Sequence, residues 1–210
     1  MTLDCQSDCQ SAQTAGDNDP RARSILPHNQ NDPPPRRVAS AGLSELWPFP
    51  LDTHRLHLDY HAWASGRLLD ATGQITPDEL TRDFKTSDKN VLEMLTHVFA
   101  ADSIWLARVR GESPTTFLAP EDRHPGVLSQ QWPAIQQRWK EWAAPLSDQD
   151  VQAKISYRDM KGNPWEQPLW QILLHVVNHG THHRGQVSGF LRAMGHNPPP
   201  LDLIAFYRDL

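Results

Sequence analysis

Residues 168–195 read PLWQILLHVVNHGTHHRGQVSGFLRAMG, and this stretch decides how the rest of the sequence is interpreted. Its apolar residues recur near the 3.6-residue period, which predicts one long amphipathic helix. Pro168 suits a first helical turn and Gly195 suits the C-terminal stop. We therefore expect a helix from near Pro168 to Ala193 or Met194.

Histidines form a stripe along this predicted helix. His175, His179 and His183 are spaced by four, so each lies one turn above the last. Side chains at positions i and i+4 lie about 5–6 Å apart at Cβ, a gap that two imidazoles can close on one cation. Both His175/His179 and His179/His183 are therefore possible ligand pairs, and the spacing does not choose between them.

A third ligand has to come from another helix, and His97 is the candidate. It falls on the apolar face of an earlier predicted helix, which carries Met94, Val98, Ala101 and Trp105. A lone core histidine is usually a hydrogen-bonded structural residue. Three converging histidines are costly to bury unless a cation satisfies them together. The sequence therefore predicts a divalent metal site made of histidines.

Three other helices and one hairpin are predicted before this last helix. Apolar periodicity indicates helices from Asp52 to Gly73, from Ser87 or Asp88 to Val109, and from Ser129 to Ala144. Asp52, and either Ser87 or Asp88, are the expected N-caps. Loose alternation over Val151 to Tyr157, followed by turn residues at 159–163, predicts a short β-hairpin. The fold class is thus all-α, a four-helix bundle with a short hairpin before the last helix.

The beginning of the sequence has a different composition. Residues 1–46 contain no Phe, Trp or Tyr and are rich in Pro, Asp, Asn, Gln and Ser. Such a stretch cannot bury enough apolar surface to offset the entropy of ordering it. We expect a disordered N-terminal extension over residues 1–46 and a single bundle domain over residues 47–210.

Charge and composition argue against several classes of function. The formal net charge of −5 argues against nucleic acid or anionic membrane as a partner. No apolar run approaches the roughly 18 residues of a membrane-spanning helix, and the start lacks the apolar centre of a secretory signal. We therefore expect a cytoplasmic protein. The two cysteines, Cys5 and Cys9, allow neither a disulfide across the core nor an all-cysteine zinc site.

Two other kinds of metal site fit the sequence poorly. It contains no HExxH motif of the zincin type. A di-iron bundle needs two Glu-x-x-His units, and the one match, Glu121 to His124, lies between prolines. Both sites are rejected.

The histidine-rich run resembles the DinB/YfiT-like family. Its most specific part is the Asn-His-x-x-x-His-Arg-Gly-Gln segment over residues 178–186, accompanied by Tyr60-His-Ala-Trp63 and Met94-Leu-Thr-His-Val98. The resemblance covers roughly residues 50–210. It implies a bundle of up-down-down-up topology, often a homodimer, that binds Zn or Ni through three histidines, one ion per chain.

Carried over residue by residue, the resemblance implies that the ligands are His97, His179 and His183. His175 then becomes a residue of the cavity wall or one that contacts a ligand. Asn178 and Gln186 are candidates for hydrogen bonds to the ligands. Arg184 adjoins the ligands and could hold a substrate anion, but a salt bridge or a helix-packing role is favoured. Glu93 precedes His97 by one turn and is the nearest candidate for a base, but we expect it on the solvated surface. No catalytic residue is assigned beyond the ligands.

Three protein ligands leave a fourth coordination position, which favours catalysis over a structural role. Neutral imidazoles leave the full charge of a dication on the site, which lowers the pKa of a bound water or thiol. Because some relatives activate a low-molecular-weight thiol, our first hypothesis is a metal-dependent transferase that uses such a thiol on a small-molecule substrate. The alternatives are a hydrolase using metal-bound hydroxide, and a non-enzymatic, metal-stabilised stress-response or binding protein.

Overall fold

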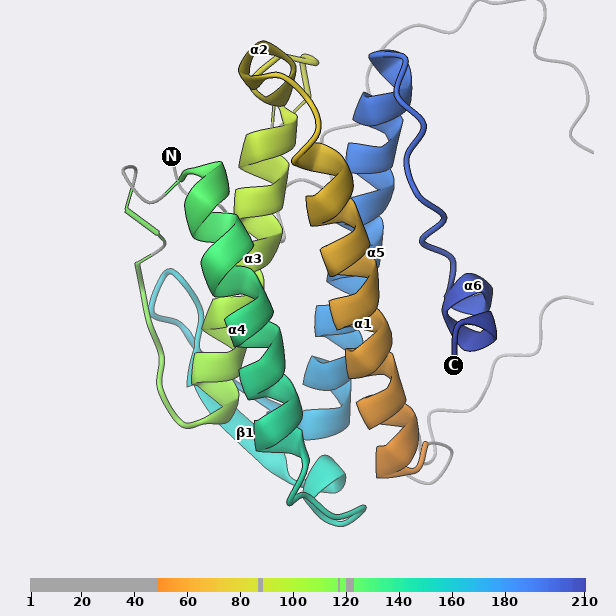
Figure 1. Ribbon diagram of the computed structural model, residues 1–210. Helices are drawn as coiled ribbons and strands as arrows, with labels where there is room; N and C mark the ends of the chain where they lie inside the picture. Colours follow the sequence, from red (N-terminus) through yellow and green to blue (C-terminus); the bar gives the residue numbers. More distant parts are fainter. Residues whose placement is uncertain (1–48, 87–88, 117, 120–122) are drawn as a thin grey trace, which may run out of the picture. The chain divides into compact units, whose positions relative to one another are not determined.

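The computed structural model describes residues 49–86, 89–116, 118–119 and 123–210. Four long helices form a bundle, as predicted: α1 (Leu51–Thr72), α3 (Val91–Val109), α4 (Pro125–Ala143) and α5 (Leu169–Ala193). In Figure 1, α1 and α5 run upward while α3 and α4 run downward. The topology is therefore up-down-down-up, which confirms the expected fold class. The predicted N-terminal extension and both cysteines lie outside the described residues.

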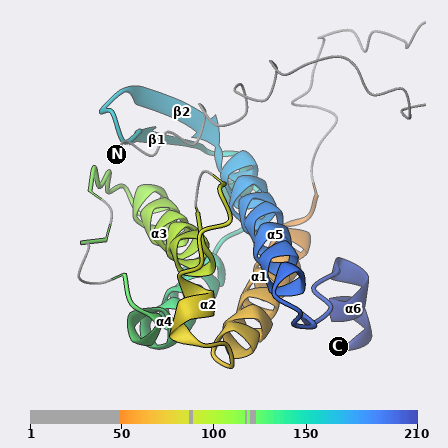
Figure 2. The same ribbon diagram turned by 90° about the horizontal axis from the view of Figure 1, so that it is seen from above.

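Each long helix packs mainly against two of the others. Helix α3 packs against α4 and α5, and α1 packs against the same two helices. Seen along the bundle in Figure 2, the four helices occupy the corners of a square, with α1 diagonal to α3. Within the described part of the chain, no helix combines the length and the hydropathy needed to cross a bilayer.

The first helix begins one residue earlier than predicted, and Asp52 is not its N-cap. The cap position is Pro50, which offers no side-chain hydrogen bond. The N–H of Leu51 instead donates to the Asp148 carboxylate at 2.6 Å, so a distant loop satisfies the helix end. Asp52 lies in the first turn and pairs with Arg55 at 2.9 Å.

Helices α3 and α4 also differ from prediction at their starts. The N-cap of α3 is Asn90, whose side chain accepts from the N–H of Glu93 at 2.8 Å; Ser87 and Asp88 lie outside the described residues. Helix α4 begins four residues before the predicted Ser129. Its N-cap is His124, and Pro125 occupies the first helical position.

The hairpin is shorter and later than expected. Residues Asp150–Gln152 form a 3-10 turn, and strands β1 (Lys154–Arg158) and β2 (Pro164–Pro168) pair antiparallel with Ser156 opposite Glu166. Strand β2 leads directly into α5, which ends at Ala193 before Gly195 at a φ of +89°. Two short helices, α2 (Pro77–Leu80) and α6 (Leu203–Arg208), were not predicted.

The core is divided along the bundle axis. One apolar cluster fills the end near the hairpin and includes Leu58, Trp139 and Ile172; another fills the opposite end and includes Leu68, Trp132 and Val187. Between them lie buried polar side chains from all four helices, which we call the polar layer: His61, Ser65, Asp102, Gln136, His179 and Arg184. The candidate site lies at this level.

Candidate metal centre

The structure brings together the three histidines selected from the sequence. His97 comes from α3, and His179 and His183 come from successive turns of α5, the helix packed against it. One ring nitrogen from each lies within 4.8 Å of the others. We call these three residues the histidine cluster. Among the described residues it is the one group of three or more potential ligands found close enough to hold an ion.

The rings of the histidine cluster face one another. Nε2 of His97 and Nε2 of His179 are 3.0 Å apart. The centroid of the His183 ring lies 4.6 Å from that of His97 and 4.4 Å from that of His179. The i, i+4 spacing on α5 therefore produces the expected close pair, and the packing of α3 supplies the third ring.

Burial keeps two of these rings neutral near physiological pH. His179 is only 8% exposed, and burial lowers its pKa to about 2, with further lowering from the neighbouring histidines. Burial, followed by the proximity of His97, lowers the pKa of His183 to about 4. A neutral imidazole carries a free lone pair, which is the form that binds a metal ion.

Gln186 fixes which nitrogen of His183 faces the cluster. Its Oε1 lies 2.7 Å from Nδ1 of His183, and because an amide oxygen can only accept, Nδ1 carries the proton. The lone pair of His183 is therefore on Nε2. This is the hydrogen bond expected of a residue that orients a metal ligand. Asn178, the other residue considered for such a role, is exposed and lines a pocket on another face of α5.

His175 continues the stripe but does not join the histidine cluster. Its ring meets the edge of Trp105 at a centroid distance of 5.1 Å, and burial lowers its pKa. It lies 5.6 Å from the ring of His179 by the same measure. His175 thus forms part of the wall beside the cluster, in the position that the family resemblance implied.

A second set of polar residues lies on the side of α5 that faces α1. Asp102 of α3 accepts from Nε2 of His61 at 2.8 Å and from Nε1 of Trp132 at 2.7 Å, both on the same carboxylate oxygen. Arg184 donates to Nδ1 of His61 at 3.0 Å and to the hydroxyl of Ser65 at 3.1 Å. A buried carboxylate and a buried guanidinium are thus joined through one imidazole. The expectation that Arg184 packs between helices is confirmed.

Gly180 makes this arrangement possible. A Cβ placed on it would lie 2.7 Å from both Nη1 of Arg184 and Nδ1 of His61, and closer still to Cε1 of His61. The ring of His61 therefore rests against the backbone of α5 at the residue after His179. Glycine is needed here because the His61 ring lies against the helix backbone, and this contact offsets the low helix propensity of glycine.

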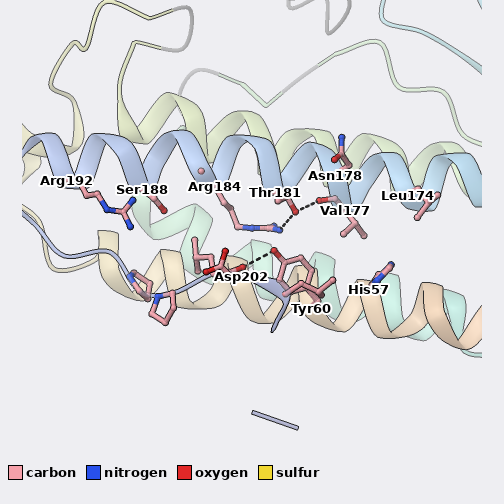
Figure 3. A pocket seen from close by; sticks show the side chains of 15 residues that line it. His57, Tyr60, Leu174, Val177, Asn178, Thr181, Arg184, Ser188, Arg192 and Asp202 are labelled. Carbon is pink, nitrogen blue, oxygen red and sulfur yellow. Dashed lines mark hydrogen bonds between the residues drawn. The ribbon is translucent and has the colours of Figure 1, made fainter. Parts of the chain in front are cut away.

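The remaining histidines of α1 do not contribute ring nitrogens to the histidine cluster. His54 is buried in the bundle, and burial lowers its pKa. His57 lines a pocket of about 700 Å³ between α1, α5 and the segment 199–203. This pocket, shown in Figure 3, lies on the opposite face of α5 from the histidine cluster and contains none of its residues. The chemistry of the cluster is therefore separate from the pocket. Glu93 is exposed, as expected.

The donor set fits a borderline divalent cation. Three imidazoles without a carboxylate suit zinc or nickel, whereas calcium and magnesium prefer oxygen ligands. Three histidines also match the ligand number of catalytic zinc sites, which keep one position for water or substrate. The cluster can therefore hold a divalent metal ion.

The fold and the histidine cluster place this chain in the class of helical-bundle proteins that can hold a metal ion through histidines of two adjacent helices. The chain belongs to the DinB family, whose family model matches residues 51–209. It is 21% identical over 154 residues to the protein named DinB of Bacillus subtilis, covering 69% of this chain and 87% of that protein. The family resemblance found in the sequence is thereby confirmed.

A solved structure shares the fold. The crystal structure of a DinB-like protein from Bacillus cereus aligns with a TM-score of 0.57 at 18% identity, over 73% of this chain and 99% of that one. At this level of identity the likeness concerns the arrangement of the helices.

Proposed function

We propose that the protein is a metal-dependent transferase in which His97, His179 and His183 bind one zinc or nickel ion. The observation that carries the proposal is the convergence of three ring nitrogens within 4.8 Å, with no carboxylate in the cluster. A bound dication would supply undiminished positive charge, which lowers the pKa of a thiol placed beside it. The co-substrate is a low-molecular-weight thiol, and the acceptor is a small electrophile.

The residues around the cluster prepare it for this role. Burial of His179 and His183 keeps their lone pairs available, and the amide of Gln186 holds the ring of His183 in one orientation. Trp105 and His175 form an aromatic wall next to His179. A site with fixed rings and an aromatic side loses little entropy when it binds a ligand.

Metal analysis tests the first part of the proposal. Plasma mass spectrometry on untagged protein should find about one zinc or nickel per chain, and His183→Ala should lose it. His175→Ala is the matched control, because His175 lies on the same stripe but outside the cluster. Folded wild-type protein that takes up neither zinc nor nickel when they are added would contradict the proposal. Equal metal content in His183→Ala and His175→Ala would contradict it as well.

Substrate panels test the second part. The metal-loaded protein should consume an electrophile only when a low-molecular-weight thiol is present, and the His183→Ala variant should not. Hydrolysis of ester or amide substrates without any thiol would instead assign the protein to the hydrolases. If the protein shows no activity on either set of substrates and its melting temperature falls strongly on chelation, the metal only stabilises the fold.

We further propose that the protein acts as a homodimer in the cytoplasm. Exposed apolar side chains near the C-terminus support the first point: Ile204, Tyr207 and Leu210. Such side chains commonly contribute to interfaces when they gather on one surface. Light scattering on purified protein gives the mass directly, and a monomer at micromolar concentration would contradict the dimer.

A further inference from the structure

The pocket between α1 and α5 has no part in the proposed chemistry, and its walls are well defined. The hydroxyl of Tyr60 donates to the backbone carbonyl of Leu201 at 2.9 Å, which fastens the segment after α5 against α1. Phe206 of α6 packs on both Tyr60 and Trp63, with centroid distances of 5.8 and 5.6 Å. A cavity of about 700 Å³ remains between this segment and α5, within the size range of small-molecule sites.

One face of α5 lines this pocket with cationic and hydroxyl groups. Arg184, Ser188 and Arg192 are spaced by four, so they form a stripe along the pocket (Figure 3). Arg184 is 1% exposed, and its Nε has no hydrogen-bond partner among the described residues. Arg192 is exposed, and no carboxylate of the described residues pairs with it. Two guanidinium groups thus border the pocket, and one of them is free.

The charged groups of the pocket are the two arginines and one carboxylate, Asp202. Because Asp102 compensates Arg184 through His61, Arg192 is the arginine of the lining that is available to a ligand. His57 is half-buried, and burial lowers its pKa, so its ring is neutral near physiological pH. The remaining lining is largely apolar and includes Leu174, Val177 and Leu203.

We infer that this pocket binds an organic anion, a molecule with an apolar body and a carboxylate, sulfonate or phosphate group held by Arg192 near Ser188. A guanidinium is the side chain best suited to such groups, because its donors match their oxygens in pairs. The apolar lining accommodates the body of the ligand. The site is independent of the histidine cluster, which lies on the opposite face of α5.

Two fluorescent probes test this inference. Anilinonaphthalene sulfonate has an apolar ring system and one anionic group, and phenylnaphthylamine has the same rings without the charge. The full chain should bind the sulfonate saturably, and Arg192→Gln should weaken that binding by about fivefold, in the range expected for one exposed charge pair. Phenylnaphthylamine binding should change by less than about twofold in the same variant.

A substitution of opposite sign localises the binding. Asp202→Asn removes the carboxylate that repels an anion, so it should tighten the sulfonate by about twofold. His183→Ala should leave both probes unaffected, because it lies outside the pocket. Arg184 is left intact, since it also joins α5 to α1.

Each contrary result overturns the inference. The inference fails if the sulfonate does not bind saturably. It also fails if Arg192→Gln weakens the binding of both probes equally, or if Asp202→Asn weakens the binding of the sulfonate. Inorganic phosphate serves as competitor: displacement of the sulfonate only at large excess supports a site that needs the apolar body, whereas displacement at equal concentration shows a simple anion site.

Discussion

Arg184 donates from Nη1 to Nδ1 of His61 at 3.0 Å, across 123 positions of sequence. Because Nδ1 accepts, the ring proton of the neutral imidazole lies on Nε2, which donates to Asp102 at 2.8 Å. The buried positive and negative charges are thus linked through one ring, and α1 is tied to both α3 and α5. Removing either charge leaves the other buried without compensation.

Asp102→Asn should strongly destabilise the metal-free protein. The substitution keeps the size of the side chain but removes the charge that compensates Arg184, so the free energy of unfolding should fall by about 3–5 kcal/mol. Urea unfolding followed by tryptophan fluorescence measures the change. Asp59→Asn is the control: it breaks a surface ion pair with Lys140 at 2.8 Å and should cost no more than about 1 kcal/mol. Similar losses in the two variants would refute a buried charge link.

Two glycines of α5 should respond to alanine with opposite signs. Gly180→Ala forces a methyl group against His61 and Arg184 and should cost about 1–3 kcal/mol, the range for overpacking. Gly189→Ala meets no atom within 4 Å and should stabilise the helix by up to about 1 kcal/mol. Thermal unfolding of both variants checks the contrast, and a neutral Gly180→Ala would show that the helices separate easily.

The stability of the metal-free protein should fall in acid as the cluster becomes protonated. The folded-state pKa values are about 2 for His179 and about 4 for His183, both below the pKa of about 6.5 that histidine has in an unfolded chain. The unfolded state therefore binds more protons below about pH 6.5, so stability is lost as pH falls from there toward about 4, and further for His179. Each group contributes a slope of at most about 1.4 kcal/mol per pH unit.

Urea unfolding at several pH values in the presence of chelator measures this slope. His179→Gln removes one of the two groups and should flatten the profile between about pH 6 and pH 4. A slope equal to that of the wild type would mean that His179 is not held neutral by burial.

Gln186→Leu should weaken metal binding without unfolding the protein. The variant frees the ring of His183 to rotate, and loss of such an orienting hydrogen bond typically reduces metal affinity by about 10- to 100-fold. Competition with a zinc indicator gives the dissociation constant. Gln171→Leu, an exposed glutamine of the same helix, should bind zinc like the wild type. Unchanged affinity in Gln186→Leu would remove Gln186 from the metal centre.

The local pattern of the sequence predicted the elements that depend on nearby residues. The four-residue spacing of His179 and His183 placed both rings on one face, and Gly195 marked the end of α5, as the structure shows. Helix starts were less predictable. The start of α1 is satisfied by Asp148 from a remote loop. The start of α4 is capped by the ring of His124, whose Nδ1 accepts from the N–H of Gly126, and Pro125 at the first helical position is a local signal for this start.

The link between Asp102, His61 and Arg184 was beyond the sequence pattern, because it depends on three helices meeting at one height. Periodicity predicts which face of a helix is buried, but not the axial alignment of one helix against another. One clue was present: Gly180 in the middle of a long helix costs about 1 kcal/mol relative to alanine, which suggests a close approach.

The polar layer has a consequence for how the helices find their alignment during folding. Helices whose interfaces are entirely apolar can shift along their axes by one turn, about 5.4 Å, and still bury apolar surface. In this protein a shift of one turn would place Asp102 and Arg184 among apolar side chains, at a cost of several kcal/mol. The polar layer therefore permits only one axial alignment of α1, α3 and α5. In that alignment His97 lies at the same position along the bundle axis as His179.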